Sequence, residues 1–237
     1  MTATVSIDAR FNGPPGSANG GYACGVAAAF IEGTARVTLR RPPPLDTDLV
    51  VHHEDGRIEF RDGGELVIEA EPATLEVGGL PRAVDLSTAE DAARRYPGLD
   101  RHPFPTCFTC GPRRPDDDGL RIYPGRVEGT DLYASPFVPD TTVTDAVGHV
   151  RPEVVWAALD CPSSFPFTDL GVVGVLGRLA ARLDAPLELG RRYVALGWPL
   201  GRDGRKLHAA SAITDEAGKL LAIAEATWVV LRDQPAT

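Results

Sequence analysis

The sequence is poor in cysteine and methionine. Four cysteines occur in 237 residues, and Met1 is the only methionine. So few cysteines cannot form a disulfide framework for a chain of this length, and we expect most of them to be reduced thiols. No apolar run approaches the roughly eighteen residues of a membrane-spanning helix, and no apolar signal segment follows the first residues. These absences predict a cytoplasmic protein without a membrane partner.

Positive charge is also scarce. The chain carries 24 Lys and Arg against 33 Asp and Glu, which gives a formal net charge of −9. Nucleic acids and anionic membranes are bound by basic surfaces, so this balance argues against both as partners. The apolar content of 43% is enough for a core in one large domain or two ordinary ones.

A Gly/Pro-rich loop near the N-terminus runs directly into an apolar, alanine-rich segment. Residues 22–32 predict a helix buried on most of its faces, with Gly33 as a stop. The first turn of a helix has free N–H groups, and the macrodipole adds partial positive charge there. Asn19, Gly20 and Gly21 therefore either cap this helix and allow tight packing, or bind an oxygen of a ligand.

Strand patterns follow each of two apolar helices. The second helix is expected from Pro152 to about Cys161, because proline suits a first helical position. Turn signals such as Asp203-Gly204 separate runs that alternate or are rich in β-branched residues. Strands are predicted at residues 5–11, 35–41, 48–53, 57–61, 66–77, 120–127, 130–137, 172–183, 187–200, 206–214 and 220–231.

The two helix-and-strand patterns predict an internal duplication. GKLLAIAEATWVVLR near the C-terminus resembles GGELVIEAEPATLEV in the first half. Between them the periodicity breaks down, apart from a short helix expected at 88–96 with Ser87 and Glu90 as a capping box. We expect one unit at residues 1–80, a connection at 81–106 and a second unit at 107–237, paired as a pseudo-symmetric dimer.

Three short motifs carry a resemblance to a known family. They are CFTCGP at 107–112, GLRI at 119–122 and EVVWAALD at 153–160. Together with paired glycines before an apolar helix, they resemble PaaI-like acyl-CoA thioesterases of the hotdog fold. The resemblance implies an α+β tandem, or double, hotdog, in which two curved antiparallel sheets each wrap a long apolar helix and form an intrachain pseudo-dimer. A homodimer of such chains is a compatible assembly.

The resemblance also implies one composite site. With Asp160 on the family's catalytic carboxylate, its His-Gly-Gly falls on Arg-Pro-Glu at 151–153, so the second half lacks the glycines. In the first half, the same spacing puts Asn19, Gly20 and Gly21 on His-Gly-Gly, and Ala28 on the carboxylate. The glycine N–H groups would then hold the carbonyl oxygen of an acyl-CoA, and Asp160 would activate water or attack directly.

Burial among apolar side chains should raise the pKa of Asp160 by desolvation. The expected substrate contacts are Tyr22, Trp156, His149 and Arg121. His149 precedes the second helix, and Arg121 is one of several arginines suited to coenzyme A phosphates. No cofactor is expected.

A metal site is not expected from the sequence. Cys107 and Cys110 have the spacing of half a zinc site, but no second pair is near. His102 is the only close histidine, and Cys161 lies far away in the sequence. A packed or turn-forming role is therefore favoured for Cys107 and Cys110.

Hydrolysis of acyl-CoA thioesters is the leading hypothesis for the function. The non-enzymatic alternative is an acyl-CoA-binding module, because the second half lacks His-Gly-Gly. A hotdog dehydratase or hydratase ranks lower: it needs an Asp/His pair at the site, and Asp145 and His149 precede the helix.

Overall fold

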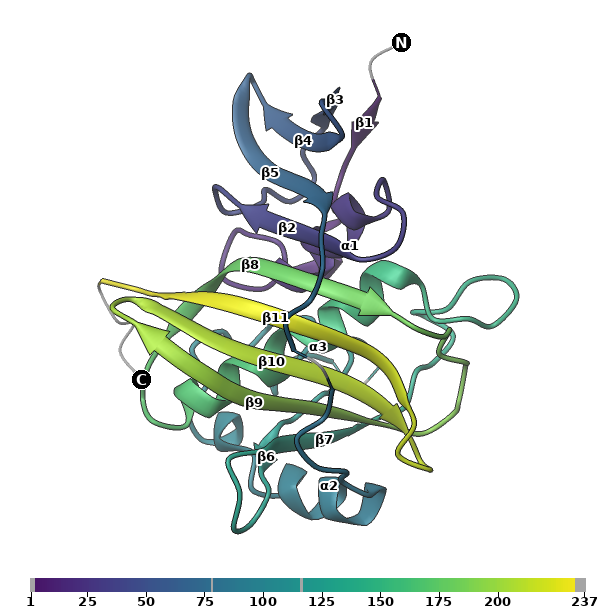
Figure 1. Cartoon of the computed structure of the whole chain (residues 1–237), viewed down its shortest axis with the longest axis vertical. Coiled ribbons are helices and arrows are strands. Elements are labelled where there is room, and N and C mark those ends of the chain that lie inside the picture. Colours follow the sequence, from purple (N-terminus) through teal and green to yellow (C-terminus); the bar gives the residue numbers. More distant parts are fainter. Residues whose placement is uncertain (1–2, 78, 116, 233–237) are drawn as a thin grey trace.

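A single antiparallel sheet of eleven strands forms the frame of the protein in the computed structural model, which describes residues 3–77, 79–115 and 117–232 (Figure 1). The strand order is β1-β3-β4-β5-β2-β8-β11-β10-β9-β7-β6. The strands are β1 (Thr4–Val5), β2 (Ala35–Leu39), β3 (Leu49–Glu54), β4 (Arg57–Asp62), β5 (Glu65–Pro72), β6 (Gly125–Arg126), β7 (Tyr133–Phe137), β8 (Gly174–Leu183), β9 (Tyr193–Asp203), β10 (Lys206–Asp215) and β11 (Leu220–Val230).

The expected pair of separate sheets is therefore corrected to one continuous sheet. In the order of the sheet, strand β2, the last strand of the first half, pairs antiparallel with β8, the first strand of the second half, and Val37 lies opposite Leu179. Pairing satisfies the N–H and C=O groups that an open edge would leave exposed. No sequence pattern marks such a junction, because the two strands are far apart in the chain.

The order of elements is the same on both sides of this junction. A helix is followed by four strands that lie in the order β2-β5-β4-β3 in the first half and β8-β11-β10-β9 in the second. The short strands β1 and β7 pair with β3 and β9, respectively. The repeated pattern in the sequence thus has a counterpart in the strand order.

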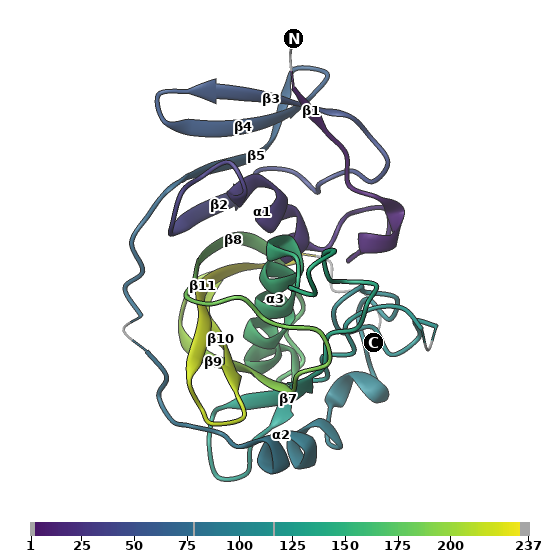
Figure 2. The same ribbon diagram turned by 90° about the vertical axis from the view of Figure 1, so that its right-hand side faces the viewer.

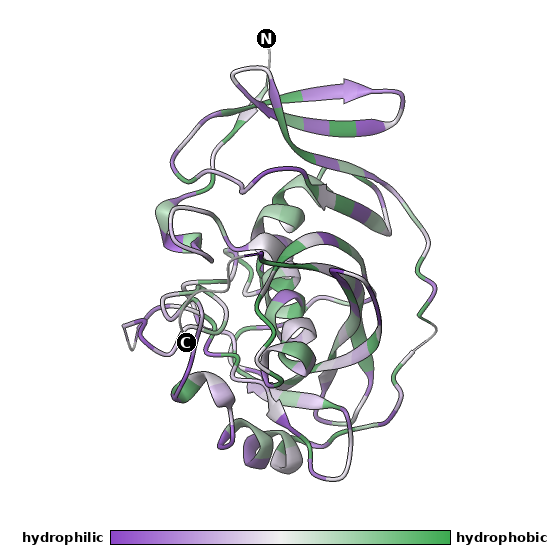
Figure 3. Cartoon of the chain, turned by 90° about the vertical axis from the view of Figure 1, so that its left-hand side faces the viewer, coloured by the Kyte–Doolittle hydropathy of each residue, from purple (hydrophilic) through white to green (hydrophobic). Residues whose placement is uncertain are grey.

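Two helices lie side by side within the curve of the sheet (Figure 2). The helix α1 (Gly20–Ala28) contacts β2, β5 and β8, while α3 (Pro152–Thr168) contacts β9, β10 and β11. Figure 3 shows hydrophobic colouring along α1, in agreement with its burial on nearly all faces. One core of buried side chains includes residues of both halves, from Ile7 to Trp228.

The first part of the connection between the halves packs on the outer face of the sheet. It contains α2 (Leu86–Ala93), which contacts β7 and β6. A second buried cluster there joins Val84 and Ala92 to Trp198 of β9 and Ile223 of β11. In the described part of the chain, no helix is long and apolar enough to cross a membrane.

Several expected boundaries differ from the structure. Most of 5–11 is not a strand, because Asp8 caps a short 3-10 helix at Ala9–Phe11. In 120–127 only Gly125–Arg126 is a strand. Asp85, rather than Ser87, accepts the capping hydrogen bond of α2, from Thr88 N at 2.8 Å. Hydrogen bonding by short polar side chains competes locally with strand formation and shifts helix starts.

The second helix is longer than expected, because it continues through Pro162 and Pro166 to Thr168. Proline removes a helical N–H donor and so leaves a carbonyl without its usual partner. Most side chains of α3 between Val154 and Pro166 are buried. Packing around α3 therefore outweighs the proline signal.

Candidate functional site

Asn19 caps the N-terminus of α1. Its side chain is 2% exposed, and its Oδ1 accepts a hydrogen bond from Tyr22 N at 2.8 Å. This bond satisfies one of the N–H groups that the first helical turn leaves open. Asn19 is thus the helix cap that the loop sequence suggested.

Asp160 of α3 lies against the same helix end. Its Oδ2 accepts a hydrogen bond from Gly21 N at 2.9 Å, across 139 residues of sequence. The side chain is 2% exposed, and its Oδ1 accepts no hydrogen bond from the described residues. The two elements that the resemblance paired are therefore in contact, but the Gly21 N–H is directed at Asp160 and not at a substrate position.

Two glycines allow this close approach of α1 and α3. A Cβ on Gly21 would lie 2.5 Å from the Cβ of Asp160, and one on Gly25 would lie 2.5 Å from the Cα of Glu153. Residues four apart share one face of a helix, so Gly21 and Gly25 form one smooth contact strip. Any side chain in this strip would force the helices apart.

Burial is the main influence on Asp160. Desolvation raises the pKa of the carboxyl group to about 7, while the Gly21 N–H acts in the opposite direction. A neighbouring Cys107 thiolate raises the pKa further, and the nearby Asn19 amide lowers it. The raised pKa that the sequence predicted agrees with this result.

The Gly20 N–H is available to a ligand. None of the described residues accepts a hydrogen bond from it. Gly20 occupies the first helical position, where the macrodipole favours a partial negative charge, and it lines a cavity. The helix end therefore has one backbone donor, on a residue of the cavity wall, without an acceptor among the described residues.

The cavity has a volume of about 400 Å³ and lies between the end of α1, the residues after β2, α3 and the strands β8 and β11. Asp160, Asn19 and Gly20 meet in its wall, and most of the rest is apolar. Other residues in the wall include Leu39, Arg40, Arg41, Pro43, His102, Phe104, Cys107, Cys110, Cys161, Phe165, Leu176 and Trp228.

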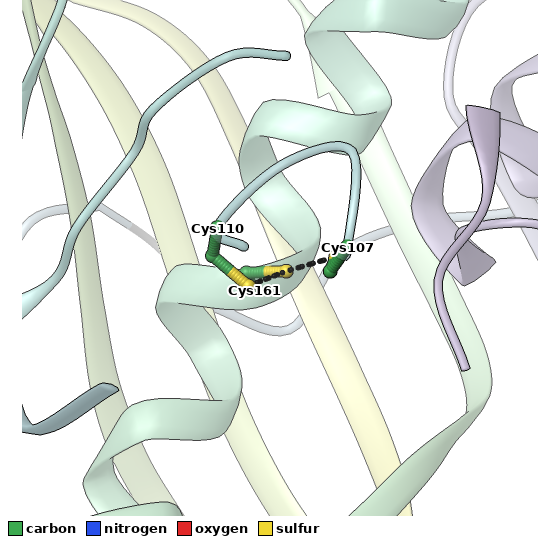
Figure 4. Close-up of side chains that lie close together, drawn as sticks. All are labelled: Cys107, Cys110 and Cys161. Carbon is green, nitrogen blue, oxygen red and sulfur yellow. Dashed lines mark hydrogen bonds between the residues drawn. The ribbon is translucent and has the colours of Figure 1, made fainter. Parts of the chain in front are cut away.

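Three buried cysteine sulfurs lie beside Asp160 in the same wall. Cys161 Sγ is 3.0 Å from Cys110 Sγ and 3.8 Å from Cys107 Sγ, and none of the three is in a disulfide (Figure 4). Hydrogen bonds from the Cys110 and Cys161 thiols hold the pKa of Cys107 well below its usual range. The sequence separated Cys161 from the pair, but the fold brings all three together.

The four expected substrate contacts are not among the described residues that line the cavity. Tyr22 is buried and stacks on Phe11 with ring centroids 3.9 Å apart. Trp156 packs against the Gly25 side of α1. His149 is exposed, and its backbone N–H donates to Asp145. Arg121 is exposed and donates to Pro115 O.

Other residues in the wall were missed by the sequence argument. Leu176 and Trp228 come from strands near the end of the chain, and Arg40 and Arg41 follow β2. Their patterns indicated only strands and turns. A third cysteine directly after the candidate carboxylate was the one signal that could have extended the site to Cys107 and Cys110.

Comparisons with known proteins identify the fold. No protein-family model matches the chain, and no curated protein matches it by sequence. A solved structure of a hot dog protein of unknown function from Alicyclobacillus acidocaldarius is similar, with a TM-score of 0.64 at 10% identity over 97% of this chain and 93% of that one.

Two further solved structures are similar over most of both chains. One is a protein from Novosphingobium aromaticivorans assigned as a thioesterase, with a TM-score of 0.64, 14% identity and coverage of 96% and 94%. The other is the tesB protein of Mycobacterium avium subspecies paratuberculosis, with a TM-score of 0.60, 11% identity and coverage of 92% and 89%. At such low identity the likeness shows the hotdog fold alone.

Proposed function

We propose that the chain hydrolyses acyl-CoA thioesters at one composite site between two hotdog halves. The observation that carries this proposal is the contact of Asp160 with the glycine end of α1, in the wall of a largely apolar cavity. A buried carboxylate and a backbone donor that has no acceptor among the described residues meet there.

The proposed halves are residues 1–80 and 107–237, joined by 81–106 and paired as a tandem hotdog pseudo-dimer. The repeated strand order and the contact between α1 and α3 support this pairing. Only one site is proposed. At the symmetry-related position Ala28 replaces the carboxylate, and Pro152 has no N–H to donate.

The proposed chemistry uses the Gly20 N–H, the Asp160 carboxylate and one water molecule. The Gly20 N–H binds the thioester carbonyl oxygen and stabilises the negative charge that develops on it. Asp160 accepts a proton from water as that water attacks the carbonyl carbon, and the proton then passes to the leaving sulfur, so the products are a carboxylic acid and a thiol. Gly21 and Asn19 position these groups through the Asp160 contact and the helix cap.

The cavity suits a CoA thioester on two further grounds. Its apolar wall offers a place for an acyl chain, and Arg40 and Arg41 are cationic residues of the same wall. Guanidinium groups bind phosphate through several donors at once. The acyl group is therefore proposed to lie among residues such as Leu176 and Phe165. The phosphates are proposed to lie near the two arginines, in place of their ion pairs with Glu69 and Glu65.

A non-catalytic acyl-CoA-binding module is the second candidate. The engaged Gly21 N–H and the almost complete burial of Asp160 favour it, because a general base must reach water. The dehydratase or hydratase reading has less support. Asp145 caps the loop by accepting from His149 N at 2.9 Å, and neither residue is among the described residues of the cavity wall.

The test compares Asp160→Asn with the wild type on acyl-CoAs of several chain lengths and on matched N-acetylcysteamine thioesters. We expect kcat to fall about 10²–10⁴-fold in the variant, because an amide cannot accept the proton. Asp131→Asn is the matched control, since this carboxylate is 79% exposed on the surface. Loss of the CoA moiety should raise KM.

Each alternative gives a different result in the same experiment. Equal hydrolysis by wild type and Asp160→Asn contradicts the role of Asp160. No turnover of any thioester, together with saturable binding of acyl-CoA by the wild type in calorimetry, identifies the binding module instead.

A further inference from the structure

The sulfur cluster has the dimensions of a metal site. In a tetrahedral zinc site with Zn–S bonds of about 2.3 Å, two ligand sulfurs lie about 3.8 Å apart. Cys107 and Cys161 have this separation, at 3.8 Å, and the sulfurs of Cys107, Cys110 and Cys161 all lie within 4.8 Å of one another. The 3.0 Å between Cys110 and Cys161 must open to about 3.8 Å to admit an ion.

The cluster is held in place before any ion binds. Gly111 N donates to Cys107 O at 2.9 Å, and a Cβ on Gly111 would lie 2.5 Å from Cys107 N, so the turn that joins the two cysteines needs glycine. Thr109 Oγ1 donates to Ala157 O of α3 at 3.1 Å, and Tyr96 OH donates to Cys110 O at 2.8 Å. Little conformational entropy remains to be lost on binding.

His102 is an outer partner of the cluster. Its Nδ1 accepts a hydrogen bond from Phe104 N at 2.9 Å, so the proton of the neutral ring sits on Nε2. Nε2 lies 3.3 Å from Cys110 Sγ and is placed to donate to it. Such a donor stabilises a metal-bound thiolate from outside the ligand set. His102 is thus not available as a ligand through Nε2 in this arrangement.

We propose that Cys107, Cys110 and Cys161 bind one zinc ion, with the fourth position on the side of the cavity. The cysteines bind the ion as thiolates, and any thiol protons that remain pass to solvent. Thiolates select soft or borderline cations, and the ligand set suits zinc in the tetrahedral geometry that it prefers. The ion would tie the Cys107–Cys110 turn to α3 one residue beyond Asp160.

A disulfide is the competing use of these sulfurs. It would join only two of the three and leave the third as a buried thiol. A bound ion explains both the convergence of three sulfurs and the placement of the His102 Nε2–H donor beside one of them. This inference does not depend on thioester hydrolysis, because it concerns a binding site that could serve an enzyme or a binding module equally.

The test uses the full chain, reduced and freed of metal, and titrated with Co²⁺ under exclusion of oxygen. We expect one Co²⁺ per chain, with sulfur-to-metal charge-transfer absorption and the intense visible bands of tetrahedral cobalt, both displaced by one equivalent of Zn²⁺. Protein purified without chelator should contain zinc by mass spectrometry.

Variants assign the ligands. Cys161→Ser and Cys110→Ser should lose the charge-transfer band, whereas Cys24→Ala should retain it, because Cys24 is a buried cysteine of α1 outside the cluster. His102→Gln should keep the stoichiometry with about 10–100-fold weaker binding. If the reduced wild type binds no Co²⁺ or Zn²⁺, the proposal is wrong, whatever the variants do.

Formation of a disulfide between two of these cysteines can be recognised by mass spectrometry. A loss of two mass units in air, reversed by reductant, without metal uptake after reduction, would identify a disulfide and overturn the zinc assignment.

Discussion

Three backbone N–H groups open α1, and each has a different environment. The Tyr22 N–H is bonded to Asn19 within the cap, and the Gly21 N–H is bonded to Asp160 of the other half. None of the described residues accepts from the Gly20 N–H, which lies at the cavity. The proposed carbonyl contact therefore depends on a single residue.

Substitutions of Gly20 can separate the N–H donor from the space that glycine leaves. Gly20→Pro removes the N–H but suits a first helical position, whereas Gly20→Ala keeps the N–H. Both add a Cβ, which would lie 2.9 Å from the side chain of Leu176, so the steric disturbance is shared. We expect kcat of the proline variant to be about 10²–10³-fold below that of the alanine variant.

The measurement is steady-state hydrolysis of an acyl-CoA, with circular dichroism to compare the folds of both variants. Equal kcat values for two folded variants would exclude the Gly20 N–H as the oxyanion donor.

At the scale of elements, the crossing of α1 and α3 depends on the glycine strip. Gly25 lies one turn after Gly21 and touches Glu153 and Trp156 without lining the cavity. Gly25→Ala should therefore lower the free energy of unfolding by about 1–3 kcal/mol through overpacking. Urea unfolding followed by fluorescence measures the change.

Gly79→Ala is the control for this substitution. A Cβ at Gly79 meets nothing within 4 Å, so the same chemical change should leave the urea midpoint nearly unchanged. A Gly25→Ala protein as stable as the wild type would mean that the helices separate at little cost.

The same elements show how far the sequence determined local structure. Turn chemistry was reliable where it required a left-handed backbone: Asp55 and Gly56 have φ values of 47° and 76°, and β3 and β4 end and begin there. Proline was a poor stop signal in α3, because packing of the buried helix outweighed the hydrogen bond lost at Pro162. Short polar side chains likewise displaced an expected strand at residues 5–11.

At the scale of the whole molecule, one sheet and one core join the two halves. β2 pairs with β8, and the main core includes residues such as Phe60 of β4 and Trp156 of α3. A shared core predicts that both halves unfold together. All three tryptophans, Trp156, Trp198 and Trp228, lie in the second half of the chain.

A substitution that destabilises the first half should therefore also lower the urea midpoint measured by the tryptophans of the second half. Phe60 is fully buried in β4, and Phe60→Ala should cost about 3–5 kcal/mol. We expect the urea midpoint of tryptophan fluorescence to fall together with that of circular dichroism. Val147→Ala, at a side chain that is 76% exposed, should move neither midpoint. An unchanged fluorescence midpoint in Phe60→Ala would show that the halves unfold independently.

The sequence by itself determined the two apolar helices, most of the strands and the capping residue Asn19. These follow from local periodicity, turn chemistry and short motifs, which a linear chain carries in full. Only the tertiary structure decided that Gly21 donates to Asp160, that β2 joins β8, and that Cys161 meets Cys107 and Cys110. Such contacts join residues distant in the chain, and their geometry depends on how closely two helices and two strand edges approach once the core has packed.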